Sequence, residues 1–254
     1  SVIHVTTLKG EKYTLFDCNV VRINSSVEVM VEYQPLYMLK NVHADAEPAF
    51  TQFFIEYPHL EAWVDKLTIN YSLFEHGKEE ITYTQNTVVD ADFQFGNVRV
   101  YPTHSSTRSS TPEKFLIQTK WLVKFDLSTA VDIESFLHDI EKIFRNLLML
   151  GLDVVLNLRS VIGYSDQFMR GSDENKHYER VEIYFAQREK TPEYTINRGF
   201  LLFKLEDFGS NFSDLVKIWY ESHNSMRPVH ELYFGVMTNP NMYLIHAFLS
   251  LVQA

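Results

Sequence analysis

Cysteine is almost absent from this 254-residue sequence. Cys18 is the only one, which excludes an internal disulfide and a zinc site built from several cysteines. A chain without disulfides is typical of a reducing compartment, so we expect a cytoplasmic protein. Because Cys18 falls in a segment of alternating apolar residues, we interpret it as a small core residue rather than a nucleophile.

Long apolar runs and an excess of basic residues are also missing. No apolar run approaches the roughly 18 residues that a membrane helix needs, and the first residues show no signal-peptide pattern. We therefore expect no membrane association. The 23 basic and 33 acidic side chains give a formal net charge of −10. Because such a surface repels phosphate, the chain is predicted to bind nucleic acid weakly.

The usual catalytic motifs are missing as well. The sequence contains no phosphate-binding Gly-rich loop followed by Lys, no GxSxG, no HExxH and no EF-hand pattern. Its ten histidines are scattered, and no two stand four residues apart on one expected helix. We therefore expect no catalytic residue, no metal site and no cofactor. These absences favour a chain that is not itself an enzyme.

Two weak motifs are better explained without catalysis. Asp90 and Asp92 share one face of an expected strand, as paired carboxylates of a glycoside hydrolase could, but the alternate positions are apolar, which indicates a solvated face. Arg170 and His177 have the spacing of the Arg-x4–6-His motif of HEPN ribonucleases. That motif requires a helix, whereas the six intervening residues read as a polar loop.

Aromatic residues are abundant, at 14% of the chain. One group could stack on a sugar or a nucleobase, although core packing is the ordinary role of aromatic residues at this density. The group consists of Phe50, Phe53, Phe54, Tyr57 and Trp63.

The most regular stretch lies in the middle of the chain. Apolar residues alternate from Phe115 to Phe125, which predicts a half-buried strand. The spacing then changes to three and four between Ile133 and Leu148, which predicts one apolar face of a helix. Ser128 or Thr129 is the expected N-cap, and Gly151 is expected to end the helix in a left-handed conformation. The residues expected to pack on the sheet that contains Trp121 are Phe136, Leu137, Ile140, Phe144 and Leu147.

The pattern of elements predicts an α+β fold. Many short strands in residues 1–127 indicate an antiparallel β-sandwich or partial barrel, and a central amphipathic helix follows. Residues 128–254 combine strands with helices and are expected to pack on the first region; the two regions could also form one continuous domain. Helices are expected from about residue 211 to 222, again after Pro228, and from Pro240 to Ala254, where the end of the sequence is expected to cut the last helix short.

Several segments resemble a known family. They are GEKYTLFDC (Gly10–Cys18), FFIEYPHLEAWVD (Phe53–Asp65), the central strand and helix, and NPNMYLIHAFLSLVQA (Asn239–Ala254). Together they resemble the N-terminal domain of ApeA-like HEPN proteins, which act in bacterial antiphage abortive defence. The resemblance implies a C-terminal HEPN domain with an RNA-cleaving Arg/His pair, and a phage-derived trigger of unspecified chemistry. No position here matches the catalytic motif, so no catalytic residue is carried over.

These observations favour a non-catalytic sensor or regulatory domain. The alternative is a β-sandwich module that binds carbohydrate or another small ligand, and a third hypothesis is a hydrolase with a scattered active site. Because the last helix is apolar almost all round, Tyr243 and Phe248 are candidate interface residues, facing either a following helical domain or a second copy of the chain as a homodimer. The alternative is that the domain covers the helix itself, with Leu215, Trp219 and Leu232.

Overall fold

A computed structural model describes most of the chain. The described residues are 1–25, 29–66, 69–73, 79–83, 89–108, 115–171, 177–187, 196–197, 199, 201–239 and 244–253. The strands are β1 (Val2–Thr6), β2 (Lys12–Phe16), β3 (Asn19–Ser25), β4 (Val29–Gln34), β5 (Tyr37–Lys40), β6 (Phe50–Glu56), β7 (Ile69–Leu73), β8 (Glu79–Tyr83), β9 (Val89–Phe93), β10 (Gly96–Arg108), β11 (Phe115–Val131), β12 (Ser160–Tyr164), β13 (Met169–Arg170), β14 (His177–Tyr178) and β15 (Val181–Phe185). The helices are α1 (Leu60–Val64), α2 (Ile133–Ser135), the π-helical segment η1 (Phe136–Glu141), α3 (Lys142–Leu152), the short 3-10 helices η2 (Asp166–Phe168), η4 (Leu205–Asp207) and η5 (Gly209–Asn211), α4 (Phe212–Thr238) and α5 (Leu244–Gln253).

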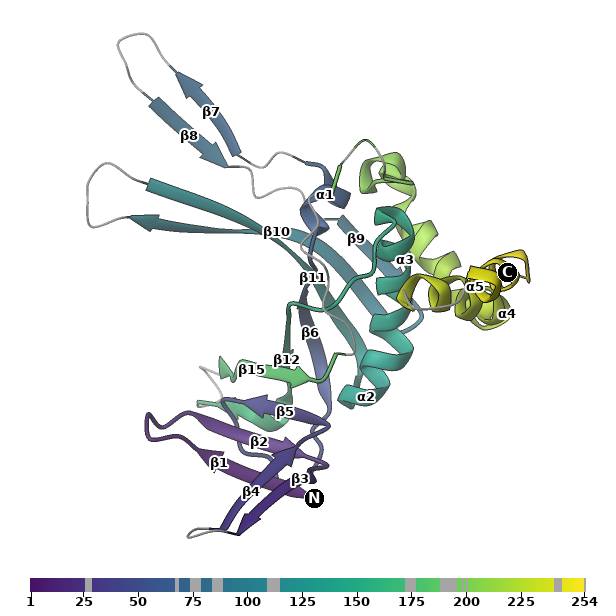
Figure 1. The fold of residues 1–254 in the computed structure, drawn as a ribbon. Helices are drawn as coiled ribbons and strands as arrows, with labels where there is room; N and C mark the ends of the chain where they lie inside the picture. Colours follow the sequence, from purple (N-terminus) through teal and green to yellow (C-terminus); the bar gives the residue numbers. More distant parts are fainter. Residues whose placement is uncertain are drawn as a thin grey trace.

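Nine strands form one antiparallel sheet that does not close. Their order is β1-β2-β5-β15-β12-β6-β11-β10-β9. The consecutive segments α2, η1 and α3 form the central helix, which lies with α4 on one face of this sheet (Figure 1). The α+β class with a large antiparallel sheet is therefore confirmed. Strands β12 and β15 come from the second half of the chain yet lie between β5 and β6. Residues 1–127 and 128–254 consequently share one sheet.

Strand register decides which side chains face the helices. Phe53 of β6 is paired with Phe125 of β11, and both are fully buried on the helix side. The next pair, Phe54 and Lys124, points to the opposite face, because successive side chains of a strand alternate. There Lys124 places its ammonium 5.5 Å from the centre of the Phe54 ring. The period-2 pattern read from the sequence is thus confirmed.

The helix begins later than the sequence predicted. Strand β11 continues to Val131, and Asp132 is the N-cap: its carboxylate accepts the Ser135 backbone N–H at 2.7 Å and the Ser135 hydroxyl at 2.8 Å. The prediction of Ser128 or Thr129 was wrong because Ser128 still belongs to the strand, where its backbone N–H donates to Phe95. A carboxylate at the N-cap also complements the positive end of the helix dipole.

Gly151 does not end the helix in the way the sequence suggested. It lies inside α3, and Asp153 takes the left-handed conformation instead, with φ of 53°. A Cβ on Gly151 would lie 2.8 Å from the Phe203 ring and 2.9 Å from Nε1 of Trp63. Glycine is therefore required here for close packing, not for a left-handed turn.

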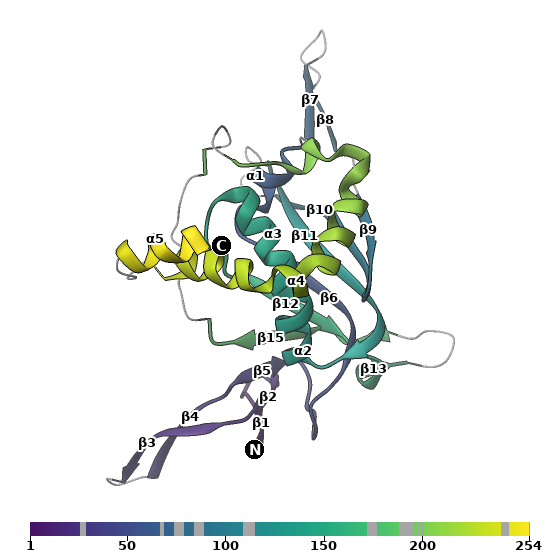
Figure 2. The same cartoon turned by 90° about the vertical axis from the view of Figure 1, so that its right-hand side faces the viewer.

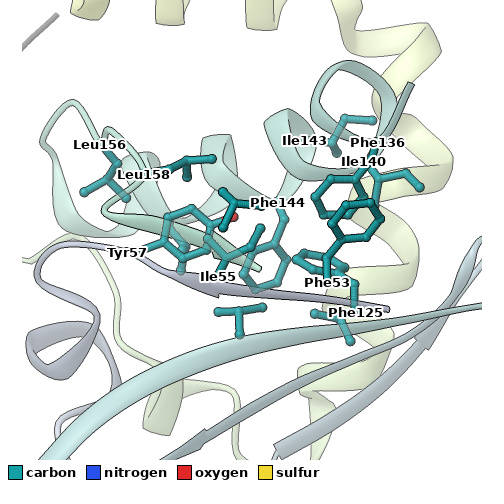
Figure 3. Close-up of a cluster of buried hydrophobic side chains, with 14 of the residues drawn as sticks. Phe53, Ile55, Tyr57, Phe125, Phe136, Ile140, Ile143, Phe144, Leu156 and Leu158 are labelled. Carbon is teal, nitrogen blue, oxygen red and sulfur yellow. The ribbon is translucent and has the colours of Figure 1, made fainter. Parts of the chain in front are cut away.

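The core lies between the sheet and the central helix (Figure 3). The rings of Phe53 and Phe136 stack with centroids 3.6 Å apart, and Phe125 meets Phe136 and Phe144 edge-on at 5.4 Å and 5.5 Å. The predicted helix face is confirmed, since Phe136, Ile140, Phe144 and Leu147 are buried and Leu137 is partly buried. Trp121, in the same sheet, is buried as well.

The C-terminal helices differ from the prediction. Instead of one helix ending near residue 222 and another after Pro228, α4 is a single helix of 27 residues with Pro228 inside it. Proline removes one intrahelical hydrogen bond but does not prevent continuation when packing holds both sides. Helix α5 lies beside α4, away from the sheet (Figure 2).

Candidate functional site

A cleft of about 1150 Å³ lies between the central helix and α4. Its remaining walls come from the start of β5, the β9–β10 turn, residues 155–157 and the end of β15. Ligand sites are commonly concave and largely apolar, with a few polar groups that converge. The floor here is apolar, formed by residues such as Ile143, Met149, Leu156 and Phe234, which are buried.

Two hydrogen bonds fix α4 to the central helix beside this cleft. The Tyr220 hydroxyl donates to the carbonyl of Ile140 at 2.7 Å, and the Trp219 indole N–H donates to the carbonyl of Ile143 at 2.8 Å. Ile140 belongs to the π-helical segment, and π-helical turns frequently occur at functional sites. The relative position of the two cleft walls therefore depends on these aromatic donors.

A buried acid stands at the end of the π-helical segment. Glu141 is 0% exposed and accepts the Tyr57 hydroxyl on Oε1 at 2.9 Å, while Nε of Arg145 lies 3.4 Å from the same oxygen. Burial raises the pKa of the Glu141 carboxyl, although the nearby Arg145 charge opposes the shift. Burial also raises the pKa of Tyr57, and the Glu141 charge adds to that shift. The second oxygen of Glu141, Oε2, has no hydrogen-bond partner among the described residues.

One wall of the cleft carries three polar side chains of α3. Lys142, Arg145 and Asn146 have i, i+3 and i+4 spacing, which places them next to one another on the helix. Asn146 is only 6% exposed, and it lines the cleft. Its amide can therefore bond to water or to a polar ligand that enters the cleft.

The opposite wall holds a pair of histidines on α4. Nδ1 of His223 lies 3.2 Å from Nδ1 of His230, and the His230 ring stacks on Trp219 with centroids 4.8 Å apart. Burial lowers the pKa of both histidines, and the His223 charge lowers that of His230 further. Both shifts favour neutral rings, in which the Nδ1–H of one histidine can donate to Nδ1 of the other.

Several polar side chains of the cleft lining already have partners. Nε of Arg227 lies 2.7 Å from a Glu231 oxygen, and Nδ1 of His138 lies 2.8 Å from an Asp139 oxygen. Lys142 forms no ion pair within the described residues. No three His, Cys, Asp or Glu residues of the described segments converge as metal ligands would.

The two aspartates singled out from the sequence lie on the exposed side of β9. Asp90 is bound by the Arg99 side chain, and Asp92 accepts the Asn97 amide at 2.9 Å. Each carboxylate therefore has its own cross-strand partner on β10. The interpretation of this face as solvated is confirmed, since Asp90 and Asp92 are both exposed.

Arg170 and His177 are directly opposite each other in the β13–β14 hairpin. Both are exposed and neither is helical, and the Arg170 guanidinium is paired with Glu179. The prediction that a helix does not hold this pair is confirmed, while residues 172–176 of the expected loop lie outside the described residues.

The aromatic group is divided between the two faces of the sheet and α1. Phe50, Phe53, Tyr57 and Trp63 are core residues, as predicted, whereas Phe54 lies on the open face, with Tyr101 and Tyr164 edge-on to it. The prediction for Cys18 was wrong. It is half-buried between β2 and β3, because β2 already ends at Phe16.

Of the two predicted interface residues, only Phe248 can be placed. It is 62% exposed on α5, and three further apolar side chains of that helix are exposed around it: Leu249, Leu251 and Val252. Tyr243 lies outside the described residues. Residues at i, i+3 and i+4 share one side of a helix, so these four form a continuous surface, here called the α5 surface.

A family model described as ApeA N-terminal domain 1 matches residues 1–219. The chain belongs to this family. No curated protein and no solved structure matches it. Membership is consistent with the N-terminal domain of an antiphage-defence protein, and it implies a further, C-terminal domain in full-length members. The matched range ends inside α4.

Sequence reasoning missed the cleft. One signal was available: Glu141, Lys142, Arg145 and Asn146 interrupt or flank the apolar face of the central helix. Glu141 stands four residues after Leu137 and three before Phe144, so it falls on the apolar face of the predicted helix, where a charge is unusual. The His223–His230 pair has a spacing of seven, two turns of one helix, but the predicted break before Pro228 separated the two residues. Within the described residues, no helix is both long and apolar enough to span a membrane.

Proposed function

We propose that this chain is a non-catalytic sensor or regulatory domain that controls a C-terminal HEPN-type ribonuclease domain in bacterial antiphage defence. Its cleft would receive the signal, and α4 would transmit it. The proposal unites the two leading hypotheses, because a sensor of this kind is also a module that binds a small ligand. The single cysteine, Cys18, supports a cytoplasmic site of action.

One observation carries the proposal: α4 lines the cleft and also packs against α5. A ligand that contacts His223 or Arg227 would bias the position of α4, which two hydrogen bonds hold against the central helix. A shift of α4 would in turn move α5. A ligand can change a conformational equilibrium only by binding one state more tightly, and a cleft shared by two helices permits that.

The α5 surface supports an output toward the following domain. Four exposed apolar side chains on one face of a helix are more than isolated surface residues, and such patches commonly mark an interaction site. Family membership implies that a C-terminal domain follows in the full-length protein. We therefore assign the α5 surface to that domain, with a second copy of this chain as the outcome that would contradict the assignment.

The experiment uses the full-length protein in bacteria that are challenged with phage. Phe248→Glu places a charge in the α5 surface and should abolish protection while the protein still accumulates and folds. Leu8→Glu is the matched control, because Leu8 is fully exposed in the β1–β2 turn, far along the chain from α5. Full protection by the Phe248→Glu protein would refute the proposed output, and a dimer that this substitution dissociates would assign the surface to self-association.

A further inference from the structure

The charged and polar groups of the cleft point to a particular class of ligand. Lys142 and Arg145 approach from one wall: Lys142 forms no ion pair with a described residue, and Nε of Arg145 lies 3.4 Å from Oε1 of Glu141. Guanidinium and ammonium groups side by side are the donors that phosphate prefers. This corner of the cleft is therefore suited to an anionic group.

Amide side chains are unusually frequent around the same cleft. They are Gln94, Asn146, Asn157, Gln187, Asn224 and Asn239. Gln187 is already committed, because its amide bonds both the N–H and the carbonyl of Leu158 at 2.7 Å. Asn146 differs from Gln187, because its side chain lines the cleft and bonds to no part of Leu158 or its neighbours; only 6% of the residue is exposed. An amide offers a donor and an acceptor together, which matches the edge of a nucleobase.

The floor provides the third requirement. Aromatic and aliphatic side chains line it, including Tyr37, Tyr220 and Phe234, all buried. A planar heterocycle can pack on such a floor, whereas free phosphate or a small dicarboxylate would leave it uncovered. The cleft volume of about 1150 Å³ also exceeds what a simple inorganic anion needs.

We propose that the cleft binds a nucleotide, with its phosphate at Lys142 and Arg145 and its base edge at Asn146. This assignment rests on the proposed sensor function and names the class of its signal. It is compatible with the predicted weak binding of nucleic acid, because one mononucleotide enters a cleft that a duplex cannot. Asn146 gives the site its selectivity for the base, and Lys142 gives it affinity for phosphate.

The test is isothermal titration of the chain with the four common nucleoside monophosphates, their nucleosides and inorganic phosphate. At least one monophosphate should bind and raise the thermal midpoint. Asn146→Ala should lower the affinity for that nucleotide roughly tenfold without changing the affinity for phosphate, which corresponds to the loss of one base contact. Lys142→Gln should lower the affinity for both the nucleotide and phosphate. Lys217→Gln, on α4 and not in the cleft lining, should change neither affinity.

Asn146→Ala is expected to fold normally, because the side chain lines the cleft and alanine has a high helix propensity. The assignment is overturned if no monophosphate binds at millimolar concentration, or if inorganic phosphate binds as tightly as every nucleotide. It is also overturned if the folded Asn146→Ala protein binds like the parent. These results leave the sensor proposal standing, since the Phe248→Glu phage experiment involves no added ligand.

Discussion

The same substitution should have opposite effects at two helical glycines. Gly151 lies in α3 against Trp63, which is 0% exposed, and an added Cβ would come within 2.9 Å of its Nε1. Gly235 lies in α4 with no atom within 4 Å of an added Cβ. Replacing a helical glycine with alanine gains roughly 1 kcal/mol from helix propensity alone. Only at Gly151 does overpacking oppose that gain.

The two contributions set the expected sizes. Overpacking a filled core costs typically about 1–3 kcal/mol, so Gly151→Ala should lower the free energy of unfolding by up to about 2 kcal/mol after the propensity gain. Gly235→Ala should raise it by about 0.5–1 kcal/mol. For a chain of this length each kcal/mol shifts the thermal midpoint by about 2–4 °C. Urea unfolding followed by circular dichroism, with thermal scans in parallel, measures both variants.

The refuting result is equally specific. If Gly151→Ala stabilises the protein as much as Gly235→Ala does, the close packing of α3 on Trp63 and Phe203 is wrong. If Gly235→Ala destabilises it strongly, α4 does not continue as one helix through that residue.

Three further predictions concern the core, the buried acid and the helix end. Phe144→Ala should lower the free energy of unfolding by roughly 3–5 kcal/mol, while Phe248→Ala on the exposed α5 surface should change it by no more than about 0.5 kcal/mol. Equal losses would contradict the burial of Phe144 in the core. The folded pKa of Glu141 is raised above its ordinary 4.5, so the contribution of this carboxyl to stability is present at low pH and is lost as the pH rises through the folded pKa. The free energy of unfolding of Glu141→Gln, measured by urea titration, should therefore rise relative to that of the parent as the pH increases from about 4.5. An unchanged difference across that range would show that Glu141 is solvated. Asp153→Gly, at φ of 53°, should raise the thermal midpoint, and a decrease would mean that the aspartate side chain supports the helix end.

The regular elements could be predicted because period and burial agree in them. The alternation of β11 and the spacing of Phe136, Ile140 and Phe144 each follow from one apolar face, and local sequence suffices to find such a face. Helix boundaries failed where tertiary pairing overrode propensity. Ser128 is a good N-cap, yet its N–H is used by the β9–β10 turn, so the strand runs on. Pro228 is a good helix breaker, yet packing carries α4 through it.

The cleft could not be predicted, because it depends on which helices meet. Lys142, Arg145 and Asn146 are ordinary surface residues in the sequence, and only the placement of α4 against the central helix makes the cleft that they line. Likewise, β12 and β15 enter the sheet between strands more than 100 residues earlier, a long-range pairing that no local pattern encodes.

The central proposal is that this chain controls an attached effector, and deletion of the chain tests it most directly. We would compare the ribonuclease activity of the purified full-length protein with that of its C-terminal part lacking residues 1–254, before and after addition of extract from phage-infected cells. We predict that infected extract changes the ribonuclease activity of the full-length protein but not that of the truncated protein. Residues 1–254 alone should show no ribonuclease activity. Equal activity and equal response in both proteins would contradict a sensor or regulatory role for this chain.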